Sequence, residues 1–213
     1  MHFETDYRLE EFILNTRWED LPEEVRERMK GCFVDLMGAL VIGSRSRQFE
    51  AGLRLAERVY GAGEIPVIGA KERFGFMGAA AAMGHSSNAY DIDDGHNMTR
   101  AHPGTSFVGA VLAAAYEKGL SRNEFLAAML VAYETTIRSG AAIMDYYQYA
   151  HSSGTFGAVG VAAGVGRIYV TGPAGQHIGW MDTLGDALYE LANADTSQVL
   201  PGNGFLNGKE PLQ

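Results

Sequence analysis

The chain has 213 residues, of which 46% are hydrophobic and 20% charged, a composition typical of globular proteins and unlike that of disordered or fibrous ones. Seventeen lysines and arginines against 26 aspartates and glutamates give a net charge of −9, which argues against binding to nucleic-acid phosphates or to an anionic membrane. The single cysteine, Cys32, excludes an intrachain disulfide and a zinc site built from cysteines.

The first half of the chain is predicted to be mostly helical. Apolar residues recur at gaps of three and four over residues 22–42, which predicts one amphipathic helix, with Asp20 as its cap and Gly43 as its end. Three further elements are expected before the middle of the chain: a helix over 49–60, a short extended connection over 65–69, and an Ala/Gly-rich helix over 74–90.

Three more helices are expected in the second half. One covers 106–118 and ends at Gly119, and a capping box of Ser121 and Glu124 opens the next, which extends to about residue 144. The third, over 154–166, carries glycines at helical spacing (157, 160 and 164) that offer a flat face for close packing. Because strands do not alternate with helices, the expected fold class is all-α, with a helical domain over 1–166 and a divergent tail over 167–213 that includes a possible helix at 181–192.

The densest polar cluster is the stretch from residue 88 to residue 104. If the preceding helix reached Gly95, Asp91 and Asp94 would share a helical face with Ser87, while Asp93 would point elsewhere. Three carboxylates at the C-terminal end of a helix are unfavourable unless hydrogen bonds, cations or a metal hold them. The cluster is therefore either a functional site or a solvated acidic loop.

Two histidines, His102 and His151, each stand just before a predicted helix. Imidazoles titrate near neutral pH, so the two could form an acid–base pair over an anion, or each could be a structural hydrogen-bonding group. The chain contains no dinucleotide fingerprint, phosphate-binding loop or hydrolase elbow. A magnesium-dependent diphosphate lyase would need a second metal-binding segment, and activity that survives EDTA would exclude it.

The order of these motifs resembles the MmgE/PrpD family, which includes 2-methylcitrate dehydratase, cis-aconitate decarboxylase and iminodisuccinate epimerase. The resemblance is carried by residues 20–25, 35–38, 67–69, 88–94, 102–104, 119–121, 132–134, 151 and 154–158. It implies a helical domain, usually paired with a smaller α/β domain in a homodimer. It also implies lyase or isomerase chemistry on small di- or tricarboxylates, without cofactor or metal.

Carried over residue by residue, the resemblance implies particular site residues. The catalytic set would be His102, His151, Asp91 and Asp94, and the substrate contacts would be Thr99, Arg100, Asp93 and Ser152. The histidines would move a proton next to a carboxylate, and cations such as Arg100 and Arg138 would hold the substrate.

The chain departs from the family pattern after residue 166. Members continue with a Lys-Pro-x-His segment and an α/β lid domain, and residues 167–213 show neither. The leading hypothesis is a 2-methylcitrate dehydratase-like hydro-lyase or an epimerase. The alternative is a catalytically inactive, truncated helical module that dimerises or complements a longer partner chain. The apolar runs are too short to cross a bilayer and the N-terminus lacks signal-peptide order, so a cytoplasmic location is expected.

Overall fold

The computed structural model describes residues 4–146 and 153–172. This part of the chain forms seven α-helices, two short 3-10 helices and one two-stranded sheet, which confirms the all-α expectation. Among these residues, no helix combines the length and the hydropathy that crossing a bilayer requires.

The elements follow one another in a simple order. They are α1 (Glu4–Asn15), η1 (Trp18–Asp20), α2 (Glu23–Gly43), α3 (Arg47–Val59), β1 (Ala62–Pro66), β2 (Arg73–Phe74), α4 (Phe76–Ser87), α5 (Pro103–Lys118), α6 (Arg122–Tyr146), η2 (Ser153–Thr155) and α7 (Gly157–Thr171). The two strands pair antiparallel, with Ile65 opposite Phe74 and an irregularity between Ala62 and Ile65.

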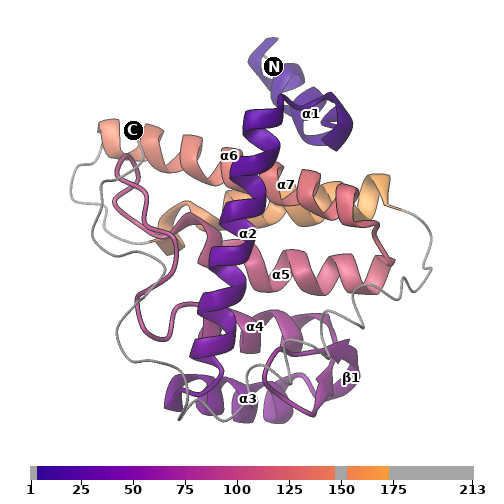
Figure 1. The fold of residues 1–213 in the computed structure, drawn as a ribbon, viewed down its shortest axis with the longest axis vertical. Coiled ribbons are helices and arrows are strands. Elements are labelled where there is room, and N and C mark those ends of the chain that lie inside the picture. Colours follow the sequence, from indigo (N-terminus) through magenta and orange to yellow (C-terminus); the bar gives the residue numbers. More distant parts are fainter. Residues whose placement is uncertain (1–3, 147–152, 173–213) are drawn as a thin grey trace.

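Five helices form a stack that the long helix α2 crosses. The neighbours in the stack are α3, α4, α5, α7 and α6 in that order, so α7, the last described helix, lies between α5 and α6 (Figure 1). Helix α2 runs across the stack and touches α4, α5 and α6, while α1 packs against α7.

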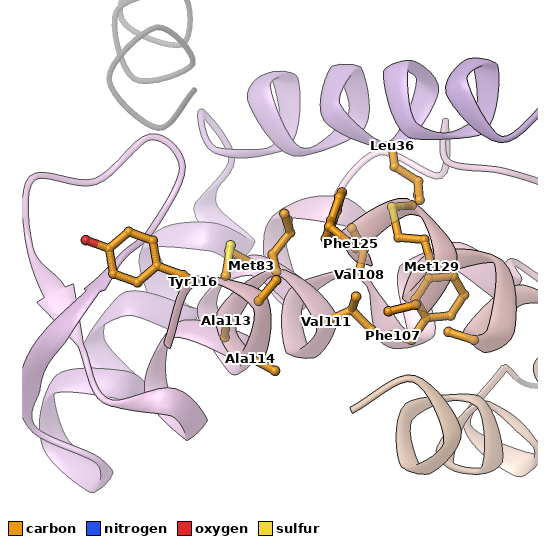
Figure 2. Close-up of a cluster of buried hydrophobic side chains, with 14 of the residues drawn as sticks. Leu36, Met83, Phe107, Val108, Val111, Ala113, Ala114, Tyr116, Phe125 and Met129 are labelled. Atoms are coloured by element: carbon orange, nitrogen blue, oxygen red, sulfur yellow. The ribbon is translucent and has the colours of Figure 1, made fainter. Parts of the chain in front are cut away.

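The core lies where α2, α5 and α6 meet. Leu36 points from α2 toward Met129 of α6 and Phe107 of α5, and all three are fully buried (Figure 2). The Phe107 ring also meets the Tyr133 ring edge-on, with centroids 4.8 Å apart. Each large apolar side chain buried in this way stabilises the fold by roughly 1.5–3 kcal/mol.

Glycines allow two of the closest helix contacts. The expected packing face of α7 is confirmed, because a β-carbon on Gly160 would overlap the Thr136 hydroxyl and lie 2.7 Å from the Ala132 carbonyl oxygen of α6. Helix α2 ends at Gly43, as expected, and a β-carbon at this position would overlap the Ser86 carbonyl. Gly43 therefore also allows α2 to pack closely on α4.

The capping box of α6 forms as expected. The Ser121 N–H donates to the Glu124 carboxylate at 2.8 Å, and the Glu124 N–H donates to the Ser121 hydroxyl at 3.3 Å. Gly119 closes α5 in the left-handed conformation, with φ of 63°.

Helix α7 begins and ends later than expected. It continues past residue 166 to Thr171, and its buried Arg167 donates hydrogen bonds to the carbonyls of Ile13 and Thr16, just where α1 ends. The division of the chain at 166/167 stays a prediction, and the expected helix at 181–192 lies outside the described residues.

Candidate active site

The three aspartates lie on a loop rather than on a helix. Helix α4 ends at Ser87, so the predicted helical face shared by Ser87, Asp91 and Asp94 is wrong. Asp91 adopts a left-handed backbone with φ of 55°, and the His96 N–H donates to the Ala101 carbonyl to close the loop. A helix carrying this charge at its C-terminal end would be opposed by its own dipole, which accounts for the early end. We call residues 88–102 the acidic loop.

His102, at the end of the acidic loop, has contacts to its backbone and to both ring nitrogens. It occupies the N-cap position of α5, where its N–H donates to the Ser153 hydroxyl at 3.0 Å and its carbonyl accepts from the Ser106 hydroxyl at 3.2 Å. Its Nδ1 lies 3.0 Å from the Asp93 carbonyl oxygen and 3.3 Å from Asp93 Oδ2, and its Nε2 lies 3.2 Å from Asp91 Oδ1.

The two aspartates beside His102 differ in environment. The Asp93 side chain is fully buried, whereas that of Asp91 is 82% exposed, so the expectation that Asp93 points away from the cluster is wrong. Carbonyl and carboxylate oxygens only accept hydrogen bonds, so Nδ1 of His102 carries a hydrogen. The second Asp93 oxygen, Oδ1, accepts no hydrogen bond from the described residues.

Asp94 contacts a helix instead of the histidine. Both of its carboxylate oxygens accept the Gly104 N–H, at 3.1 and 2.9 Å, in the first turn of α5. The pKa of Asp94 is raised to about 7, chiefly by burial; the charges of Asp93 and Asp35 add to the rise, and the Gly104 N–H and the Tyr133 hydroxyl oppose it. A carboxyl group that titrates near neutral pH therefore lies directly behind the histidine.

Three groups near Asp94 were not predicted as site residues. Asp35 and Cys32 come from α2, and Tyr133 comes from α6. Burial raises the pKa of all three, and nearby aspartates raise each further. The sequence does contain a sign of this: the Asp35 carboxyl and the Tyr133 phenol stand at helical positions whose neighbours, such as Leu36, are core residues.

The remaining predicted site residues lie at different depths. Thr99 is fully buried and donates to the His96 carbonyl at 3.2 Å, while Arg100 is exposed and has a backbone φ of 50°. Arg138 pairs at 2.8 Å with Glu134 on the outer side of α6. The predicted catalytic His151 and its neighbour Ser152 lie outside the described residues.

One part of the site has the spacing of metal ligands. Ligand atoms of Asp91, Asp93 and His102 lie within 4.8 Å of one another, which a small divalent cation could bridge. The same atoms already form carboxylate–imidazole pairs, which account for their proximity without an ion.

Two grooves in the described part of the chain lie away from the acidic loop. One, of about 600 Å³, is lined by η1, the start of α6 and the end of α7. The other, of about 790 Å³, lies between η1, α2 and α6. Neither is lined by residues 88–104.

Comparison with known families gave a match over most of the chain. A family model described as the MmgE/PrpD N-terminal domain matches residues 7–179, which include the acidic loop, helices α2 to α7 and the predicted His151. Comparison with curated proteins gave no match.

Proposed function

Because the chain belongs to the MmgE/PrpD family, which includes lyases and epimerases, we propose that it acts on a small di- or tricarboxylate as a cofactor-independent lyase or isomerase. The proposed reaction is dehydration in the manner of 2-methylcitrate dehydratase, carried out by a cytoplasmic homodimer. The observation that carries the proposal is the position of His102 between the buried Asp93 and the exposed Asp91.

His102 is the group that we propose to move the proton. Asp93 holds its Nδ1–H, so Nε2 faces Asp91 and the solvent-exposed side of the loop. In a dehydration, the base removes the proton from the carbon next to a carboxylate, the electron pair forms the double bond, and the neighbouring hydroxyl leaves as water with a proton from the acid. A positioned imidazole contributes roughly 10²–10⁴-fold to such a step.

The second proton transfer we assign to His151. The support is that Ser153, whose hydroxyl accepts the His102 N–H, is the second residue after His151 and directly follows the proposed substrate contact Ser152 in the chain. One histidine then serves as base and the other as acid. An epimerisation needs the same first step, with the proton returned to the opposite face of the carbon.

The substrate carboxylate needs a cationic partner. Arg100 is exposed at the tip of the acidic loop and forms no ion pair with the other described residues, so we propose that it binds the substrate. Thr99 and Asp93 are buried, and we propose that they serve the site by holding the loop and His102 in place.

The test is an assay of the purified chain with 2-methylcitrate, cis-aconitate and iminodisuccinate, following substrate loss by NMR. We expect turnover of one of them, and a fall in kcat of about 10²-fold or more in His102→Gln. The control is His85→Gln, which removes a half-buried histidine of α4 outside the site. If no substrate is consumed, or if His102→Gln is as active as the control, the proposal is wrong.

A second candidate function is a helical module that completes a longer partner chain without turning over substrate itself. It is favoured by the composition of the site, where the carboxyl groups of Asp35 and the acidic loop outnumber the guanidinium of Arg100. Such a site opposes the binding of a polyanion. Co-expression with a lysine-bearing full-length family member separates the two candidates, because turnover that appears only in the mixed complex supports the second.

A further inference from the structure

Helix α5 begins without a cap from its own N-cap residue. His102 makes no side-chain bond to the first turn, and Pro103 has no N–H. The next N–H, that of Gly104, is bonded by both oxygens of Asp94, ten residues earlier in the chain. A carboxylate at this end of a helix also meets the positive end of the helix dipole. Asp94 thus supplies from the acidic loop the cap that α5 lacks.

This contact closes the chain into a ring that contains the catalytic histidine. Asp94 directly follows Asp93 in the chain, and Gly104 is two residues from His102, so both partners of the His102–Asp93 pair lie within two residues of an anchored residue. Two other bonds to the His102 backbone come from the Ser153 and Ser106 hydroxyls.

The contact between Asp94 and Gly104 leaves no room for a side chain at position 104. A β-carbon on Gly104 would lie 2.8 Å from both Asp94 Oδ1 and Leu36 Cδ1, and would collide with the Tyr133 hydroxyl. Gly104 is itself buried, so water has little access to replace the carboxylate as acceptor of its N–H. The glycine, the tyrosine and the leucine together enclose the Asp94 carboxyl at the base of α5.

We infer that Asp94 is a positioning residue: its carboxylate anchors the acidic loop to α5 and so holds His102 against Asp93, without touching the substrate. The inference rests on the proposed function, because what Asp94 positions is the proposed acid–base group. It assigns to Asp94 a role different from those of Asp91 and His102, which face the open side of the loop.

Two substitutions separate positioning from direct chemistry. Asn at position 94 keeps an oxygen that can accept the Gly104 N–H, whereas Ala does not. We expect Asp94→Ala to lower kcat by roughly 10- to 100-fold with little change in KM, and Asp94→Asn to stay near wild type, because displacement of a catalytic group is costly. The matched control is Ser121→Ala, which removes the α6 cap far from the site and should leave kcat unchanged.

The second readout is the ¹H–¹⁵N NMR signal of the His102 ring, which requires no turnover. We expect it to shift in Asp94→Ala and to keep its position in Asp94→Asn and in Ser121→Ala. If Asp94→Ala does not fold, Gly104→Ala provides the same readouts, because its methyl group would displace the carboxyl from the other side.

The outcomes of the positioning and function tests are distinct. Equal loss of kcat in Asp94→Asn and Asp94→Ala, with an unshifted His102 signal, would show that Asp94 takes part in the chemistry and would overturn the inference. Unchanged kcat and an unchanged signal in Asp94→Ala would overturn it too. If the His102 signal shifts in Asp94→Ala while the wild-type protein consumes no substrate, the anchoring role of Asp94 is supported and the proposed function is refuted.

Discussion

The titration of Asp94 should make the stability of the fold depend on pH, and the substitution Asp94→Asn should remove that dependence. Its pKa is raised from the ordinary 3.8 to about 7, chiefly by burial, so the folded chain binds this proton more tightly than the unfolded chain. The stability that Asp94 contributes is therefore fully present below pH 3.8 and is lost as the pH rises through 7. Asp94→Asn keeps the acceptor for Gly104 and has no charge to bury.

The size of the effect follows from the shift. Each pKa unit corresponds to about 1.4 kcal/mol, and about two units of the shift fall between pH 5 and pH 7. Relative to wild type, Asp94→Asn should gain about 3 kcal/mol in free energy of unfolding between about pH 5 and pH 8. This is a large part of the roughly 5–15 kcal/mol that stabilises a typical domain.

The measurement is urea unfolding of both proteins across this pH range, followed by circular dichroism. Other titrating groups affect both proteins alike, so only the difference between them is used. Glu57→Gln, which removes a charge on the exposed side of α3, is the control and should show no such trend. A difference between Asp94→Asn and wild type that stays constant from pH 5 to pH 8 would refute the argument that burial makes the ionised carboxyl costly.

Three further predictions concern the scaffold. Gly160→Ala should lower the free energy of unfolding by about 1–3 kcal/mol, because its methyl group would overlap the Thr136 hydroxyl, whereas Gly166→Ala, with open space around it, should be neutral or stabilising in urea unfolding. Ser121→Ala should lower the same free energy by about 1 kcal/mol through loss of the α6 cap, and no change would contradict the capping role. Arg167→Gln should speed amide hydrogen exchange in α1 selectively, because the guanidinium holds the end of that helix, and uniform exchange would refute this.

The elements that sequence reasoning predicted well are those set by local rules. The stripe of α2 follows from 3.6-residue spacing, and the box of Ser121 and Glu124 follows from the needs of any helix N-terminus. Gly119 ends α5 because glycine adopts a positive φ without strain. The glycine face of α7 was also visible, since residues three and four apart share a side.

The candidate site was predicted in part, and the errors about its aspartates come from one wrong helix boundary. Extending α4 past Ser87 placed Asp91 and Asp94 on one face and turned Asp93 away, whereas the loop brings Asp93 onto His102. Propensity favoured the longer helix, and the mutual repulsion of the carboxylates and the end of the helix dipole opposed it.

Long-range contacts explain what sequence reasoning missed. Asp35 and Tyr133 lie almost a hundred residues apart, and only the crossing of α2 over α5 and α6 brings them to Asp94. No periodicity in either helix encodes that crossing. The bond between Asp94 and Gly104 likewise spans a loop, where neither helical nor strand spacing applies.

The place of α7 in the stack has a consequence for biosynthesis. Helix α7 packs against both α5 and α6, which also touch each other, and it is made last of the three (Figure 1). During translation, therefore, some forty residues of α5 and α6 leave the ribosome before α7, which covers part of both helices, has been made. Nascent chains stalled ahead of residue 157 should be strong clients of chaperones, and those stalled well beyond residue 171 should not.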